Sequence, residues 1–349
     1  MEIIDGQVHL NHLGLDACVA AMDAVGVDGA IIDQFPPTAT RLEGGAIRCS
    51  YEISEAAVRR FPARFAYVAR IDPTDPDMER LVAEVRTHPG RLGVRVDQPP
   101  AALLAGDAYA AFFRAAQQSE LPMWIVLPGR LAELRPHVEA FPDLRFIVDH
   151  AGMPETWPRT GSDRFAPLGA LIELARYRNV AVKWGHMTKM SARAFPYHDV
   201  LAQLQRVVDA FGPERIMWES DWTQCRGHET LAEMLFSLRL ASVLSDNEKE
   251  WILGRSALSL MRWDRADDKV DTILVDPSRW DDFSAALAAA GRLPHGGVKA
   301  VQLGEGTIPM SGRQVSTVAL SDTRQVTVAG AVYAMLNGRA PPPELEERG

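Results

Sequence analysis

The chain has 349 residues, of which 47% are hydrophobic and 24% are charged, as in an ordinary soluble globular protein. Its 37 basic and 46 acidic residues give a net charge of −9, which argues against nucleic acid or an anionic membrane surface as the partner. The length suits one domain of about 250 residues with a smaller appendage.

Cysteine usage and the first residues indicate the compartment. The three cysteines, Cys18, Cys49 and Cys225, lack metal-finger spacing, and an odd number does not suit a disulfide scaffold. The first segment, MEIIDGQVHL, has no basic region, and no apolar run reaches the ~18 residues of a membrane span. We therefore expect a soluble, cytoplasmic protein.

Eight short apolar runs alternate with helical patterns over residues 1–264. The expected strands are Ile3–His9, Gly29–Gln34, Phe65–Ile71, Leu92–Val96, Met123–Leu127, Arg145–His150, Val180–Trp184 and Arg215–Glu219. The expected helices are Leu15–Val25, Ser54–Phe61, Met78–Thr87, Tyr109–Gln118, Arg130–Phe141, Pro167–Tyr177, Val200–Phe211 and Thr230–Leu240. Eight strand–helix units predict an α/β fold, a (β/α)8 TIM barrel, with an open doubly wound sheet as the alternative. No Gly-x-Gly-x-x-Gly turn follows the first strand, so dinucleotide binding has no support.

The chain changes in character after the eighth unit. A helix over Asp246–Met261 is expected to pack against the outside of the barrel, and the charged stretch 262–269 marks a joint. Residues 265–349 then predict a small C-terminal α+β extension with a flexible Pro-rich tail. Its expected strands are Thr272–Val275, Val298–Leu303, Val315–Leu320 and Gln325–Val328, and its expected helices are Trp280–Ala290 and Gly330–Leu336.

Polar side chains gather at the carboxyl ends of the expected strands, where barrels carry their sites. Residues two apart in a strand share a face, so six such side chains should meet at one opening. They are His9, Arg95, His150, Lys183, Glu219 and Asp221. A structural role is the alternative for each, and Lys183 would need Asp221 or Glu219 as a partner if buried. The longest loops, 35–47 and 153–165, lie at the same end and are expected to set specificity.

Four segments carry a family resemblance. IIDGQVHL, RFIVDHAG, NVAVKWG and FGPERIMWESDW resemble the strand-end motifs of the amidohydrolase-related superfamily. The nearest group is its amidohydrolase 2 branch of TIM-barrel hydrolases, which contains sugar lactonases and 2-pyrone-4,6-dicarboxylate lactonase. The similarity covers roughly residues 1–264.

The chain also departs from the family pattern. Gln7 stands where metal-binding relatives have a first-strand histidine, Val126 and Leu127 where they have a fifth-strand histidine, and Glu219 where glycine is usual. The resemblance leaves His9, His150 and Asp221 to hold a single divalent metal, zinc or manganese. The lactonase relatives suggest that the same set also works without one, and we expect no obligatory, tightly bound zinc.

The resemblance implies an amidohydrolase-superfamily hydrolase acting on a small anionic lactone or ester. Asp221 would be the general base and later the acid, with His9 and His150 polarising the carbonyl. Arg95 and Lys183 would hold substrate carboxylates. The rest of the expected substrate-binding set is Gln7, His186, Glu219 and Trp222.

Several alternatives stay open. Glu219 would either raise the proton affinity of one carboxylate of the Glu219–Asp221 pair or compensate a buried Lys183. The activity could instead be that of a metal-dependent decarboxylase or hydratase, or of a repurposed, non-hydrolytic member of a biosynthetic pathway. The expected partner is a small-molecule substrate, and a homodimer is compatible with the sequence.

Overall fold

The structure is a computed structural model that describes residues 1–10, 14–35, 37–154, 164–224 and 230–265, with four short strands beyond them. The chain divides into two compact units. One comprises residues 1–58 and 65–264, and the other comprises residues 59–64 and 265–349.

Eight parallel strands of the first unit form the predicted TIM barrel, with the strand order β1-β2-β5-β6-β7-β8-β9-β10. The strands are β1 (Ile4–Val8), β2 (Gly29–Ile32), β5 (Phe65–Arg70), β6 (Arg91–Asp97), β7 (Met123–Val126), β8 (Phe146–Val148), β9 (Val180–Trp184) and β10 (Ile216–Trp218). The ends of the sheet meet because Val8 bridges to Trp222, and the Asp221 N–H donates to the Gln7 carbonyl at 3.0 Å. All eight expected strands are therefore confirmed.

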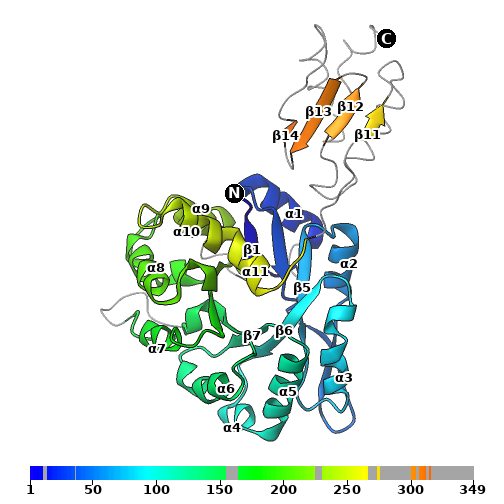
Figure 1. The fold of residues 1–349 in the computed structure, drawn as a ribbon, viewed down its shortest axis with the longest axis vertical. Helices are drawn as coiled ribbons and strands as arrows, with labels where there is room; N and C mark the ends of the chain where they lie inside the picture. Colours follow the sequence, from blue (N-terminus) through cyan, green and yellow to red (C-terminus); the bar gives the residue numbers. More distant parts are fainter. Residues whose placement is uncertain are drawn as a thin grey trace. The chain divides into compact units, whose positions relative to one another are not determined.

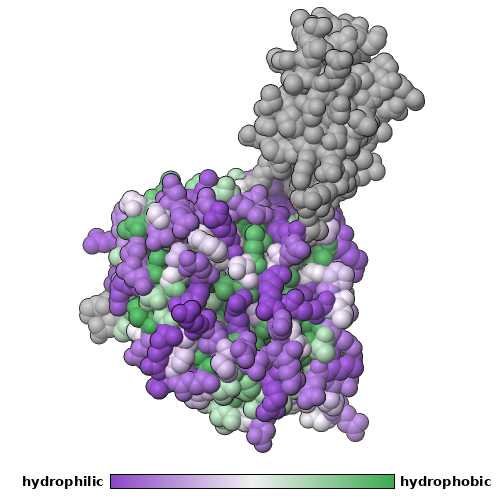
Figure 2. Space-filling view, in the orientation of Figure 1, coloured by the Kyte–Doolittle hydropathy of each residue, from purple (hydrophilic) through white to green (hydrophobic). Residues whose placement is uncertain are grey.

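Helices surround these strands in Figure 1. They are α1 (Gly14–Val25), α2 (Glu52–Arg60), α3 (Met78–Ala83), α4 (Ala101–Leu104), α5 (Asp107–Gln118), α6 (Arg135–Ala140), α7 (Leu168–Leu174), α8 (His198–Phe211), α9 (Leu231–Arg239), α10 (Asp246–Glu250) and α11 (Ser256–Leu260). Their apolar faces turn inward, as Leu201, Leu204 and Val208 do on α8. The described outer surface is mainly hydrophilic in the view of Figure 2, with small hydrophobic areas between.

The last helical segment of this unit corrects one expectation. α11 does not pack on the outside of the barrel. Its Ala257 and Leu260, followed by Met261 and Trp263, join the apolar cluster inside the barrel. The indole N–H of Trp124 points to the Met261 sulfur at 3.1 Å. Since this cluster contains residues near the starts of the strands, α11 closes the amino-terminal end, opposite the expected site.

The loop after β2 contains a hairpin that the sequence pattern did not predict. β3 (Thr38–Arg41) lies within the expected loop 35–47 and pairs antiparallel with β4 (Ile47–Ser50), which begins at the last residue of that loop. Its Arg48 is tied to Asp75 by two hydrogen bonds of 2.6 and 2.9 Å. This ion pair attaches the hairpin to the loop after β5. Of the other expected long loop, 155–163 lie outside the described residues.

The second unit contains a four-stranded sheet of β11 (Ile273–Val275), β12 (Ala300–Leu303), β13 (Gly306–Ser311) and β14 (Gln314–Val315). β11 and β12 pair parallel, and the remaining pairs are antiparallel. β11 and β12 fall on expected strands, whereas β13 was not expected. The two helices expected in this unit lie outside the described residues, as does Cys225. Among the described helices, none has the length and apolar character to cross a membrane.

Candidate active site

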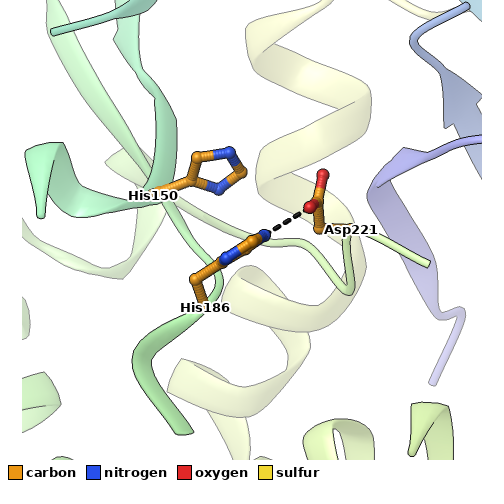
Figure 3. A group of neighbouring side chains, drawn as sticks. All are labelled: His150, His186 and Asp221. Carbon is orange, nitrogen blue, oxygen red and sulfur yellow. Dashed lines mark hydrogen bonds and ion pairs between the residues drawn. The ribbon is translucent and has the colours of Figure 1, made fainter. Parts of the chain in front are cut away.

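Three polar residues stand just past the ends of consecutive barrel strands. His150 follows β8, His186 follows β9 and Asp221 follows β10, and their side chains converge in Figure 3. All three have a left-handed backbone, with φ values of 51°, 59° and 54°. This conformation costs a non-glycine residue about 1–2 kcal/mol. Backbone strain of this kind is concentrated at functional sites, so the three residues mark the candidate site.

The first strand delivers its polar residues through a bulge. The register of β1 against β2 shifts between Asp5 and Val8. Ile4 packs in the apolar cluster inside the barrel, yet Gln7 and His9 reach the interior above it. The extra residue in β1 reverses the alternation. Asp5 therefore does not join the site, and its carboxylate accepts the N–H groups of Gln7 and Ser220 at 3.1 and 2.8 Å.

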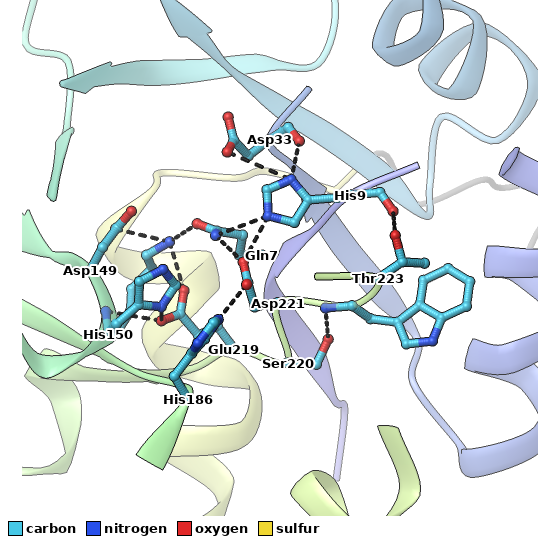
Figure 4. A network of polar contacts seen from close by, with 12 residues as sticks. Gln7, His9, Asp33, Asp149, His150, His186, Glu219, Ser220, Asp221 and Thr223 are labelled. Atoms are coloured by element: carbon cyan, nitrogen blue, oxygen red, sulfur yellow. Dashed lines mark hydrogen bonds and ion pairs between the residues drawn. The ribbon is translucent and has the colours of Figure 1, made fainter. Parts of the chain in front are cut away.

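Above the apolar cluster, the barrel is filled by what we call the polar layer, most of which is labelled in Figure 4. Its members are Gln7, Asp33, Arg95, Asp149, Lys183 and Glu219, all buried. Opposite charges alternate in it. Arg95 lies 2.9 Å from Asp149, and Lys183 lies 2.9 Å from Asp149 and 2.8 Å from Glu219. The expected pairing of Lys183 with Glu219 is present, whereas Lys183 does not pair with Asp221.

The two cations of the polar layer are engaged by the protein itself. Lys183 is 0% exposed, and its ammonium also donates to Gln7 and lies 3.6 Å from the centre of the Trp124 ring. Arg95 is 6% exposed and donates to Asp33 and to Gln7. Both groups are thus buried among protein partners, and their expected contact with substrate carboxylates stays a prediction.

Asp221 is a buried anion surrounded by donors. Its Oδ1 lies 2.7 Å from His9 Nε2 and accepts a hydrogen bond from the Gln7 amide, while Oδ2 contacts His186 Nε2. Burial alone would raise the pKa of Asp221, but nearby His9 and His186 hold that pKa well below its ordinary value. Asp221 is therefore ionised at neutral pH.

His150 is held by Glu219, two residues before Asp221. Glu219 Oε1 accepts from His150 Nδ1 at 2.6 Å and from the His150 backbone N–H at 3.1 Å. Burial would lower the pKa of His150, but the Glu219 carboxylate raises that pKa above its ordinary value. In turn, burial would raise the pKa of Glu219, yet His150 and Lys183 lower it. Of the two roles expected for Glu219, compensation of Lys183 is the one that these contacts display.

Gly185 provides the space for the Glu219 side chain. A Cβ atom on Gly185 would lie 2.2 Å from Glu219 Cγ, far inside contact distance. A glycine between Trp184 and His186 is thus required by the position of Glu219. The half-buried Trp222 is placed by its own backbone, whose N–H donates to Ser220 Oγ at 3.0 Å.

Sequence reasoning missed two carboxylates of the polar layer, Asp33 and Asp149. Both follow apolar strands, as Glu219 does, so the strand-end rule could have found them. Burial would raise the pKa of Asp33, but Arg95 and Arg70 lower it. Sequence reasoning also missed Lys189, whose ammonium lies 2.6 Å from His186 Nδ1.

The sequence profile of the family described as Amidohydrolase matches residues 13–263. This chain belongs to that family. It is accordingly an amidohydrolase-family enzyme with lactone-related proteins among its relatives. D-galactarolactone isomerase of Agrobacterium fabrum is 27% identical over 212 residues, 60% of this chain and 67% of the relative. L-fucono-1,5-lactonase of Burkholderia ambifaria is 33% identical over 109 residues, 30% of this chain and 36% of the relative.

A solved amidohydrolase from Burkholderia multivorans with bound zinc shares the fold. Its TM-score is 0.61 at 20% identity, over 75% of this chain and 99% of that structure. In the present amidohydrolase, ligand atoms of His150, His186 and Asp221 lie within 4.8 Å of one another. Two imidazoles and a carboxylate suit a divalent ion by type and spacing. His186, rather than the expected His9, completes this set, because His9 lies on the other side of the Asp221 carboxylate (Figure 4).

Proposed function

We propose that this amidohydrolase hydrolyses the ring ester of a small lactone, with Asp221 moving the proton. The observation that carries the proposal is the Asp221 carboxylate, which is ionised, buried and fixed by His9, His186 and Gln7 at the site end of the barrel. The names of the two relatives, a lactone isomerase and a lactonase, favour a lactone over an amide.

In the proposed reaction, the oxygen of a water molecule attacks the lactone carbonyl carbon and gives its proton to Asp221. The bond between the carbonyl carbon and the ring oxygen then breaks, and the proton returns from Asp221 to that oxygen. The product is a hydroxy acid. Proton transfer by one positioned side chain is worth roughly 10²–10⁴-fold in rate.

His150 is the group that we assign to the carbonyl oxygen. Its Nδ1 is taken up by Glu219, which leaves Nε2 for the site, and its raised pKa favours the form with a proton there. We assign His9 to Asp221 rather than to the carbonyl, since its Nε2 lies 2.7 Å from that carboxylate. Arg95 and Lys183 act as framework within the polar layer. A divalent ion that displaced the hydrogen bond between His186 and Asp221 would be held by His150, His186 and Asp221, and it would supply Lewis-acid polarisation of the same carbonyl.

Isomerisation is a second candidate, favoured by the relative that is called an isomerase. A hydroxyl group of the substrate would replace water as the nucleophile, and Asp221 would again take and return one proton. The ester moves to another oxygen, and the product is a lactone of different ring size. The same residues serve both reactions, so the choice between them depends on whether water enters.

Purified protein should be assayed against neutral and carboxylate-bearing sugar 1,4- and 1,5-lactones. Acid release reports hydrolysis, and NMR reports isomerisation. With an active lactone, Asp221→Asn should lower kcat by about 10²–10⁴-fold while the circular dichroism spectrum is unchanged. Asp97→Asn, which alters an exposed carboxylate at the end of β6, should keep most of the activity. Full activity of Asp221→Asn, or no turnover of any lactone, would reject the proposal.

A further inference from the structure

His186 is bonded on both ring nitrogens, to a cation on one side and an anion on the other. Its Nδ1 lies 2.6 Å from the ammonium of Lys189, three residues later in the short helix Met187–Met190. Its Nε2 contacts Asp221 Oδ2. The His150 ring lies beside it, with ring centres 4.2 Å apart and the ring planes inclined at 47°.

These partners decide where the ring proton of His186 lies. A lysine ammonium can only donate, so His186 Nδ1 must accept. A neutral imidazole carries one ring proton, which is therefore on Nε2. A carboxylate can only accept, and Asp221 takes that proton's hydrogen bond. Burial and the neighbouring His150 lower the pKa of His186, which agrees with a neutral ring.

Gln7 is oriented by the same rule. Its Oε1 receives hydrogen bonds from Arg95 and Lys183, which both only donate. Its NH2 group must then face Asp221 Oδ1. The donors that Gln7 and His186 present to Asp221 are thus oriented by three cations that do not themselves pair with Asp221. These are Arg95, Lys183 and Lys189.

We propose that Lys189 is a positioning residue that locks His186 in the Nε2–H tautomer, which commits His186 to Asp221 and withholds it from a metal ion. Binding of an ion through Nε2 would require the ring proton to move to Nδ1, where it would face the Lys189 ammonium, donor against donor. Metal-binding histidines have the opposite arrangement, in which the second ring nitrogen donates to a carboxylate or carbonyl. His150 has that arrangement with Glu219, and His186 does not.

The role of Lys189 in turnover rests on the proposed function, but its effect on His186 does not. Three variants of residue 189 separate the effects. Lys189→Met keeps the length and removes the donor, Lys189→Arg keeps a donor-only cation, and Lys189→Glu supplies an acceptor. The probes are Zn²⁺, followed by calorimetry, and Co²⁺, followed by visible absorption. Neither metal probe requires a lactone.

We expect the wild type and Lys189→Arg to bind Zn²⁺ with equal, weak affinity. Lys189→Met and Lys189→Glu should bind it about 10–100-fold more tightly, the range by which partners of a metal-bound histidine alter affinity. Nitrogen NMR of ¹⁵N-histidine-labelled, metal-free protein should show His186 protonated on Nε2 in the wild type and in Lys189→Arg. Lys189→Glu should move the proton to Nδ1. A merely structural role of Lys189 would change neither the Zn²⁺ affinity nor the position of the His186 ring proton.

Two results would overturn the proposal. One is a wild-type protein in which the metal-free His186 is protonated on Nδ1. The other is equal Zn²⁺ affinity of all four proteins. If the NMR and metal results hold while every lactone fails, the tautomer lock stands and only the proposed function falls.

Discussion

The two layers inside the barrel differ in chemistry although the same strands build both. Ile31 and Asp33 are two residues apart and share a face, and so are Ala181 and Lys183. The lower members pack in an apolar cluster that α11 closes, and the upper members form the polar layer. Only the height along the barrel distinguishes them.

The two layers are therefore expected to tolerate substitutions differently. An apolar layer can adapt to the loss of a methyl group, at a cost that depends on the cavity left. In the polar layer each charge is balanced by a specific neighbour, so removal of one leaves another buried without compensation. The Lys183 ammonium, 3.6 Å from the Trp124 ring centre, is where the layers meet.

The largest effect is expected from Lys183→Ala. It leaves Asp149 and Glu219 without their shared cation, and breaking a buried ion pair costs about 3–5 kcal/mol. Chemical denaturation measures the loss in free energy of unfolding. Arg80→Ala is the control, because its pairs with Asp77 and Glu84 are exposed to solvent and should change the free energy of unfolding far less. Equal losses for the two variants would contradict the claim that each charge of the polar layer is balanced by a specific buried neighbour.

Gly185→Ala should come next. The new Cβ would lie 2.2 Å from Glu219 Cγ, and overpacking of this kind costs up to about 3 kcal/mol. Glu219 would also be displaced from His150, so NMR of the His150 ring should change. Gly169→Ala on α7 meets no atom within 4 Å and should be neutral or slightly stabilising. An unchanged Tm for Gly185→Ala would show that Glu219 can lie elsewhere.

Asp5 gives a smaller, pH-dependent effect. Burial raises the pKa of Asp5 to about 7, and its Oδ2 has no hydrogen-bond partner among the described residues. Because the pKa is higher in the folded state, the contribution of Asp5 to stability is greatest in acid and is lost as the pH rises through 7. Asp5→Asn, which cannot ionise, should therefore gain about 2–3 kcal/mol relative to wild type between pH 5 and pH 8. A pH-independent difference would contradict this.

The barrel could be predicted because each of its strands is a short apolar run with a helical pattern after it. The position of α11 could not be predicted in this way, since an apolar stripe shows that a helix packs but not on which surface. The β3–β4 hairpin was missed because its strands, such as Thr38–Arg41, are polar and largely exposed.

The candidate site was predictable at the level of strand ends and not at the level of partners. Strict alternation places Asp5 with Gln7 and His9, but the bulge in β1 separates them, and a bulge leaves no period in the sequence. The partner of Lys183 could not be predicted, because the sequence does not show whether Glu219 or Asp221 lies at the height of Lys183 along the barrel. The left-handed backbone at His186 turned a residue expected to contact substrate toward Asp221.

The fit of Glu219 over Gly185 gives a rule for sorting related sequences. A chain with a carboxylate at the position of Glu219 has room for it only if a glycine stands two residues after the strand lysine. Lys183-x-Gly185 and Glu219-x-Asp221 therefore form one structural unit, although they lie far apart in the sequence. Relatives that carry both motifs should share the polar layer. In relatives with glycine at the position of Glu219, the residue at the position of Gly185 is free to vary.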